Sequence, residues 1–336
     1  MSIAKTQNTS NEDVLDLTLR PKTWGSFVGQ DKTKNNVKII VEAAKKRKDQ
    51  VEHLLFYGNP GLGKTTMAYL VAQEIGADIK ITSGPAIERA GDLAAILTNL
   101  EEGSVLFCDE IHRLSRTVEE YLYPAMEDFK LNLILGKGPM ARVMELNLPK
   151  FTLIGATTKL ASISGPLRSR FGAIFGLNFY SNEDIEQVLV RSCRILNVLA
   201  EKDALKIIAE HSRFTPRIAN HLLKRVRDFS QVKNENLITK EIIEDAFLNL
   251  EIDRLGLTQS DRRLLEALVV KFNGGPVGIQ TLAAATAEEE ATILDIYEPY
   301  LMRIGLIART PQGRVATKMA FEYLGVSPAN LPKILF

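Results

Sequence analysis

Short apolar runs alternate with segments of helical period over the first half of this 336-residue chain. Four runs are rich in Val, Ile, Leu and Phe, as are strands buried on both faces of a parallel sheet. These predicted strands lie at residues 54–57, 79–82, 105–108 and 151–156. Strands that alternate with helices predict an α/β domain with a doubly wound parallel sheet.

After Tyr180 the strand pattern stops and helical periods take over. A small helical lid is expected, with helices at 182–196, 201–211, 217–232 and 239–248. A third unit follows, with helices at 259–272, 279–285 and 288–304 and two short strands around Pro311-Gln312-Gly313, and this order describes a winged helix. The predicted domains are a flexible tail at 1–16, the large domain at 17–180, the lid at 181–255 and the winged helix at 256–336.

A phosphate-loop pattern, G-x-x-x-x-G-K-[ST], follows the first predicted strand in the stretch Gly58-Asn59-Pro60-Gly61-Leu62-Gly63-Lys64-Thr65. Its glycines let backbone N–H groups turn toward phosphate oxygens, and the helix after it adds the positive end of its dipole. We expect Lys64 to reach the β and γ phosphates and Thr65 to bind Mg²⁺. Gly61, Leu62, Gly63 and Thr66 complete the expected nucleotide contacts. A simple glycine-rich turn is the alternative.

Two adjacent acids, Asp109 and Glu110, end the third predicted strand. We expect Asp109 in the Mg²⁺ shell and Glu110 to polarise the attacking water. Solvated carboxylates at a strand end are the alternative, which a nearby phosphate loop disfavours. The two motifs together predict an ATPase or GTPase.

Composition restricts the expected cellular location of the protein more than it restricts its chemistry. No apolar run approaches the roughly 18 to 20 residues that cross a membrane, and residues 1–13 are too polar for a secretion signal, so we expect a cytoplasmic protein without a membrane partner. The two cysteines, Cys108 and Cys193, provide neither a disulfide framework nor a zinc cluster. The net charge of +1 neither requires nor excludes a nucleic-acid partner.

Charge is segregated within the last unit. Arg303, Arg309, Arg314 and Lys318 follow one another without an acid before Glu322. A wing tipped by Arg309 and Arg314 is expected to bind the phosphates of duplex DNA without reading bases. A solvated basic hairpin without a ligand is the alternative.

Alternating apolar residues around Gly136-Lys137-Gly138-Pro139 predict a β-hairpin inserted at about 130–148. Leu131, Leu133 and Leu135 share one face of it. Packing against the sheet and docking of a partner protein are both open interpretations.

Further motifs accompany the two ATPase signatures. They include Leu19-Arg20-Pro21-Lys22, Asp109-Glu110-Ile111-His112-Arg113-Leu114, Gly155-Ala156-Thr157-Thr158, Pro166-Leu167-Arg168-Ser169-Arg170-Phe171-Gly172 and Thr215-Pro216-Arg217-Ile218-Ala219-Asn220. In this order, over roughly residues 17–325, the chain resembles the RuvB family of AAA+ ATPases, the bacterial motors of Holliday-junction branch migration.

The resemblance implies roles that the chemistry permits. Thr158 resembles the first sensor, a hydroxyl that hydrogen-bonds the γ phosphate or the attacking water. Arg170 resembles an arginine finger offered to the nucleotide of a neighbouring subunit, and Arg217 resembles the second sensor.

The resemblance also implies nucleotide contacts at residues that no sequence motif would identify without the family. It places Leu19, Arg20 and Tyr180 around the base and sugar, and Glu127, Asp128 and Phe129 in contacts across a subunit boundary. In isolation, Leu19 and Phe129 are predicted core residues and Arg20 a surface charge.

The family further implies ATP and Mg²⁺ as cofactors, the double-stranded arms of Holliday junctions as substrate, and a homo-oligomeric, hexameric ring. Its expected protein partners are RuvA, through the 130–148 hairpin, and a RuvC-type resolvase. Alternatives are a related ATPase such as a clamp-loader subunit or protein unfoldase, and a nucleotide-switched winged-helix regulator that does not translocate.

Four positions depart from the family pattern. Glu290 stands where an arginine associated with DNA contact is usual, and Phe214 replaces a glycine. Asn59 replaces a proline of the phosphate loop, and Lys159 an arginine after the first sensor. We expect ATP chemistry to survive these changes and DNA handling to be weaker or differently angled.

Overall fold

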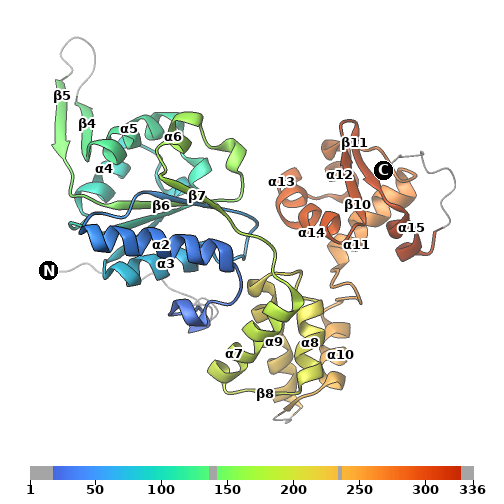
Figure 1. The fold of residues 1–336 in the computed structure, drawn as a ribbon. Coiled ribbons are helices and arrows are strands. Elements are labelled where there is room, and N and C mark those ends of the chain that lie inside the picture. The colour runs from blue at the N-terminus through green and yellow to red at the C-terminus, as the bar shows by residue number, and fades with distance from the viewer. Residues whose placement is uncertain (1–17, 136–141, 234–236, 327–336) are drawn as a thin grey trace. The chain divides into compact units, whose positions relative to one another are not determined.

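The computed structural model describes residues 18–135, 142–233 and 237–326, which form two compact units divided after Tyr180 (Figure 1). The predicted tail at 1–16 and the turn of the predicted hairpin lie outside the described residues. Within the described ranges, no helix combines the length and the apolar content that a membrane span requires.

The first unit is built on a five-stranded, all-parallel sheet with the order β2-β3-β6-β1-β7. The strands are β1 (Leu54–Tyr57), β2 (Ile79–Ser83), β3 (Val105–Asp109), β6 (Thr152–Thr157) and β7 (Ala173–Gly176). The predicted α/β fold with a doubly wound sheet is thereby confirmed. The sequence pattern missed β7, because this edge strand is only partly buried and lacks a long apolar run.

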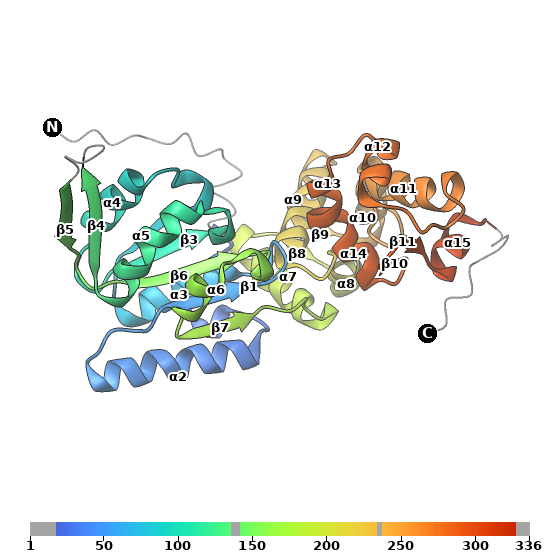
Figure 2. The same ribbon diagram turned by 90° about the horizontal axis from the view of Figure 1, so that it is seen from above.

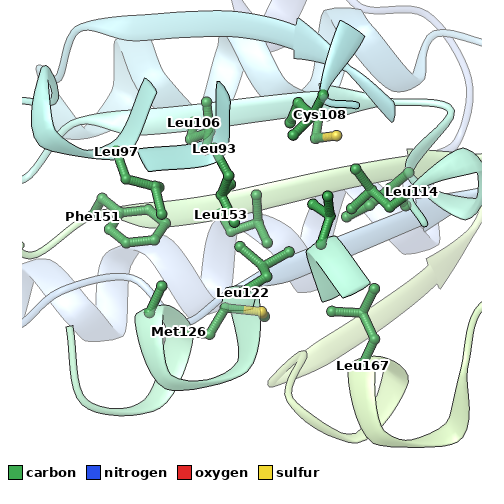
Figure 3. Packing of buried hydrophobic residues seen from close by; sticks show 14 of the residues in the cluster. Leu93, Leu97, Leu106, Cys108, Leu114, Leu122, Met126, Phe151, Leu153 and Leu167 are labelled. Atoms are coloured by element: carbon green, nitrogen blue, oxygen red, sulfur yellow. The ribbon is translucent and has the colours of Figure 1, made fainter. Parts of the chain in front are cut away.

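Helices cover both faces of this sheet (Figure 1). On one side lie α2 (Asp31–Arg47) and α3 (Lys64–Ile75), and on the other lie α4 (Ala90–Thr98), α5 (Arg116–Glu127) and α6 (Gly165–Ser169). Short 3₁₀ turns occur at Trp24–Ser26, Gly84–Ala86, Ile111–Arg113 and Leu160–Ser162. The leucines of α4 and α5 pack on β3 and β6, as Figure 3 shows for Leu97, Leu122, Leu106 and Leu153. This core holds the carboxyl ends of the strands in place.

Both cysteines are buried and unbridged. Burial raises the pKa of the Cys108 thiol to about 12, and the neighbouring Asp109 adds to the shift. The thiol in β3 therefore stays neutral and behaves as a core side chain.

The predicted hairpin consists of β4 (Lys130–Leu135) and β5 (Arg142–Asn147), paired antiparallel and extending beyond the sheet (Figures 1 and 2). Leu131 is fully buried, and Leu133 and Leu146 pack against the core of the first unit. Ordinary packing therefore accounts for the base of the hairpin. The side chain of Leu135 lies outside the described part of the structure.

The lid segment of the second unit contains α7 (Asn182–Leu196), α8 (Lys202–Glu210), α9 (Pro216–Val232) and α10 (Lys240–Asn249). The lid was predicted to contain helices alone, and this prediction is incomplete. A parallel pair, β8 (Leu199–Ala200) and β9 (Leu237–Ile238), ties the segments after α7 and α9 together. Strands of two residues are too short to produce a detectable alternation.

The winged-helix segment begins with α11 (Gln259–Glu266), which continues as a π-helical turn at Ala267–Lys271, and α12 (Ile279–Thr286). The predicted helix at 288–304 comprises α13 (Glu290–Thr292), a π-helical turn at Ile293–Tyr297, and α14 (Glu298–Arg303). The wing is the antiparallel pair β10 (Ile307–Thr310) and β11 (Gly313–Ala316), followed by α15 (Lys318–Leu324), which the sequence pattern missed.

A buried ion pair joins the lid and winged-helix segments. Arg213 lies before α9 and donates to Asp261 of α11 at 2.5 Å, and Asp261 also caps α11 by accepting from Thr258. Phe214 packs beside the ring of Tyr300, with centroids 6.1 Å apart. The departure from glycine at position 214 thus adds an aromatic contact to this joint.

Candidate active site

The phosphate loop bends sharply between β1 and α3. Gly58 and Gly63 have φ values of 143° and 102°, in the region that favours glycine. A Cβ atom on Gly58 would lie 2.6 Å from the carbonyl oxygen of Leu177, and one on Gly63 would lie 3.1 Å from the ring of Phe27. Only glycine suits these two positions, so the loop geometry follows from its sequence.

Lys64 is the first residue of α3, and its side chain curls back over its own loop. The ammonium group donates to the carbonyl oxygens of Gly58 at 2.7 Å and Asn59 at 3.0 Å. Thr65 and the buried Thr66 continue the first turn of α3. The positive charge and the helix N-terminus therefore meet where a polyphosphate would bind.

Asp109 and Glu110 lie at the carboxyl end of β3. Asp109 is the last strand residue, and its Oδ1 accepts the backbone N–H of Glu110 at 2.9 Å. Glu110 has a φ of 48°, so the chain leaves the sheet at this residue. Gly84 backs the turn, because a Cβ atom there would lie 2.4 Å from the Glu110 carbonyl oxygen.

The strand order brings Thr158 to the same edge. Because β6 lies between β1 and β3, its carboxyl end separates the phosphate loop from the acidic pair. The backbone N–H of Gly58 donates to the Thr157 carbonyl at 3.2 Å, and the Thr158 hydroxyl donates to Glu110 Oε2 at 3.4 Å. The structure thus places Thr158 beside the acid expected to polarise water.

His112 was not among the predicted site residues. Its Nδ1 lies 3.3 Å from Glu110 Oε2 and 2.9 Å from the Thr157 hydroxyl oxygen. The motif Asp109-Glu110-Ile111-His112-Arg113-Leu114 includes this residue but does not predict the contact, because the 3₁₀ turn at Ile111–Arg113 and the neighbouring strand create it.

Tyr180 and Phe27 lie next to the phosphate loop. The Tyr180 hydroxyl donates to the Leu62 carbonyl at 3.2 Å, and an added Cβ on Gly63 would face the Phe27 ring and the Tyr180 hydroxyl. Leu19 is buried in the core, and the Arg20 guanidinium lies 5.4 Å from the ring centroid of Tyr69. Tyr180 therefore has a direct structural link to the loop, and Phe27 is a neighbour that sequence reasoning missed.

Comparisons with known proteins agree with this arrangement. Family models described as the Holliday junction DNA helicase RuvB P-loop domain, the RuvB AAA lid domain and the RuvB C-terminal winged helix domain match residues 19–177, 180–253 and 254–325. The chain belongs to the RuvB family. The family resemblance inferred from the sequence motifs is confirmed.

Individual relatives cover nearly the whole chain. The Holliday junction branch migration complex subunit RuvB of Dehalococcoides mccartyi is 54% identical over 316 residues, 94% of this chain and 90% of that protein. The protein of the same name from Chloroflexus aurantiacus is 55% identical over 317 residues, 94% and 91% of the two chains. The Thermotoga maritima RuvB Holliday junction branch migration motor has a TM-score of 0.85 at 43% identity, covering 92% and 99%.

Arg170, which resembles the RuvB-family arginine finger, contacts its own subunit. Its guanidinium donates to Glu127 at 3.2 Å and to the Pro166 carbonyl at 2.8 Å, and lies 4.4 Å from the ring centroid of Tyr123. Glu127 and Asp128 are exposed at the end of α5. The structure thus gathers Arg170 and Glu127 on one surface.

The remaining predicted nucleotide residues differ in their surroundings. Phe129 is partly buried and packs its ring edge-on against the core residue Phe151, with centroids 6.0 Å apart. Arg217 lies exposed in the first turn of α9 in the second unit, and its contact with nucleotide stays a prediction.

The two wing arginines share one buried partner. Arg309 and Arg314 are register partners in β10 and β11, and both donate to Glu298 of α14 at 2.8–3.3 Å. The Glu298 side chain is 2% exposed, whereas those of Arg309 and Arg314 are 52% and 12% exposed. Sequence reasoning missed Glu298, and this partner makes the two arginines unequal: only Arg309 has a largely accessible side chain.

Proposed function

We propose that this chain is the ATP-driven motor subunit that moves Holliday junctions along DNA by pulling on their duplex arms. The convergence of the phosphate loop, Thr158 and the Asp109–Glu110 pair at one sheet edge carries the proposal, together with the family membership. Such an edge is where nucleotides bind in open α/β sheets.

The residues divide the chemistry among them. Lys64 and the loop N–H groups bind the phosphates, and Glu110 orients and polarises the attacking water. Thr65 and Asp109 supply the hard oxygen ligands that suit Mg²⁺, which would neutralise phosphate charge. Tyr180, Leu19 and Arg20 enclose the base and sugar, and Arg217 reports the γ phosphate to the lid.

A ring of subunits completes the site in this proposal. Arg170 acts on the nucleotide of a neighbouring subunit, with Glu127, Asp128 and Phe129 nearby. The shared surface of Arg170 and Glu127 supports this role, because both side chains are then available at one boundary. We propose a hexamer, a RuvA partner on the 130–148 hairpin, and a RuvC-type resolvase acting on the same junction.

Arg309 is the proposed phosphate contact of the wing, and Arg314 chiefly neutralises Glu298. Arg309→Ala should weaken duplex binding equally across sequences and lower the salt slope by about one phosphate contact. Arg314→Ala should instead destabilise the second unit by about 1–3 kcal/mol, because it removes the more buried partner of Glu298 and leaves Arg309 as the remaining one. Salt titrations with random-sequence duplex and thermal unfolding check both. Equal salt slopes for the parent and Arg309→Ala would place the DNA path elsewhere.

Unwinding of a synthetic four-way junction tests the proposed function directly. With ATP, Mg²⁺ and a RuvA-type partner, the chain should convert the junction into duplex products, and omission of ATP should abolish conversion. A clamp-loader subunit or unfoldase would show ATPase activity that junction DNA leaves unchanged, and a winged-helix regulator would bind DNA without converting it.

A further inference from the structure

We infer that His112 is a positioning residue for ATP hydrolysis, which donates its Nδ1–H to the carboxylate of Glu110 and thereby aims that carboxylate at the attacking water. The inference rests on the proposed role of Glu110. The inference adds His112 to the residues proposed for hydrolysis, because neither the phosphate-loop motif nor the acidic pair predicts a histidine there.

The fold delivers His112 to this position through a tight turn. The left-handed φ of Glu110 ends β3, and the 3₁₀ turn that follows is closed by the Arg113 N–H donating to the Glu110 carbonyl at 2.9 Å. Gly84 leaves room for this turn, because its missing Cβ would meet Glu110 and Arg113. The His112 side chain returns to the sheet edge and is only 9% exposed.

The neighbours of Nδ1 indicate where its proton lies. The Thr157 hydroxyl oxygen already accepts the backbone N–H of Lys159 at 2.9 Å and lies 2.9 Å from Nδ1. Glu110 Oε2 lies 3.3 Å from the same nitrogen. With the proton on Nε2, Nδ1 would accept from the Thr157 hydroxyl and turn its lone pair toward the negative Glu110 oxygen, which is unfavourable. We therefore place the proton on Nδ1, where the Thr157 oxygen and Glu110 Oε2 share it.

Glu110 Oε2 then has two donors, His112 Nδ1 and the Thr158 hydroxyl at 3.4 Å. Two donors on one oxygen fix the plane of the carboxylate and the direction of its other oxygen. Both distances are slightly longer than those of ordinary hydrogen bonds, as catalytic contacts often are before the substrate binds, and we expect them to shorten in the reacting complex. Thr157 is fully buried in β6, so it anchors the imidazole to the rigid sheet.

Substitutions of His112 separate positioning from packing. His112→Asn keeps an N–H donor near the place of Nδ1, His112→Gln moves the amide toward the place of Nε2, and His112→Leu keeps volume without a donor. In the full chain with junction DNA, His112→Leu and His112→Gln should lower kcat by about 10- to 100-fold, as loss of an orienting hydrogen bond does. His112→Asn should retain most of the parent kcat, and KM for ATP should stay within about twofold in all three.

A coupled variant tests whether His112 works through Glu110. In the Glu110→Gln background, His112→Leu should cause no further loss of kcat. Three outcomes would each overturn the inference. They are a parent-like kcat in His112→Leu, an equal loss of kcat in His112→Asn and His112→Gln, and a further loss of kcat when His112→Leu is added to Glu110→Gln. If His112→Leu does not fold, the Asn and Gln pair still decides. Parent-like turnover of Glu110→Gln alone would instead overturn the proposed role of Glu110 itself.

Discussion

Glu110→Gln should bind ATP as the parent does and lose turnover by about 10²- to 10⁴-fold, the usual contribution of a general base. The substitution keeps the size of the side chain and the acceptor for Thr158, but it removes the charge that is proposed to polarise water. Equilibrium binding of ATP and steady-state phosphate release measure the two effects separately. The separation is expected because Glu110 lies at the end of β3, across β6 from the loop that holds the phosphates.

Lys64→Ala is the matched control for this experiment. It removes the ammonium group that lies over the phosphate loop, so it should lose ATP binding together with turnover. Turnover of Glu110→Gln at the parent rate would show that another group activates the water. Loss of ATP binding in Glu110→Gln would mean that the acid acts chiefly in nucleotide or Mg²⁺ binding.

Arg170→Ala should bind ATP and hydrolyse it about 10³- to 10⁵-fold more slowly, the range that arginine fingers contribute. Because Arg170 would act on a neighbouring nucleotide, rings mixed from Arg170→Ala and Glu110→Gln subunits should recover activity. Recovery is expected only at boundaries where the Arg170 of a Glu110→Gln subunit reaches the site of an Arg170→Ala subunit, which has an intact Glu110. The measurement is ATP turnover over a series of mixing ratios.

Subunit exchange must be shown in the same mixtures, for example by energy transfer between labelled subunits. Glu127→Gln is a useful companion, because it removes the charged partner of Arg170 at 3.2 Å and leaves the guanidinium in place. It should affect turnover far less than Arg170→Ala does. Mixed rings that form but recover no activity would argue that Arg170 does not serve a neighbouring site.

Local signals in the sequence determined much of this fold. Helix α7 begins and ends where its pattern predicts, at Asn182 and Leu196, because its N-cap is local: the Ser181 side chain accepts from the Asp184 N–H. The phosphate loop is likewise local, since glycines at positive φ and the following helix are encoded within a few residues. The doubly wound class followed from strands and helices that alternate along the chain.

Elements stabilised mainly by distant partners escaped the sequence pattern. The edge strand β7 exists because it pairs with β1, more than a hundred positions earlier in the chain, and the two-residue strands β8 and β9 exist because they pair with each other. The ion pair of Arg314 escaped the sequence pattern for the same reason, because the buried carboxylate of Glu298 comes from another element. The hydrophobic periodicity of a segment does not identify partners that lie far away in the sequence.

The sequence by itself therefore determined the fold class, the phosphate loop, the acidic pair and the family. Each of these features depends on one short contiguous segment or on several such segments in a fixed order. Only the tertiary structure decided which side chains meet. The order β3-β6-β1 brings Thr157 and Thr158 to Glu110 and His112, and the pairing of β10 with β11 turns Arg309 and Arg314 toward one carboxylate. Hydrogen bonds and ion pairs form only between atoms about 3 Å apart. The folding of the whole chain brings such atoms together, whatever their separation along the sequence.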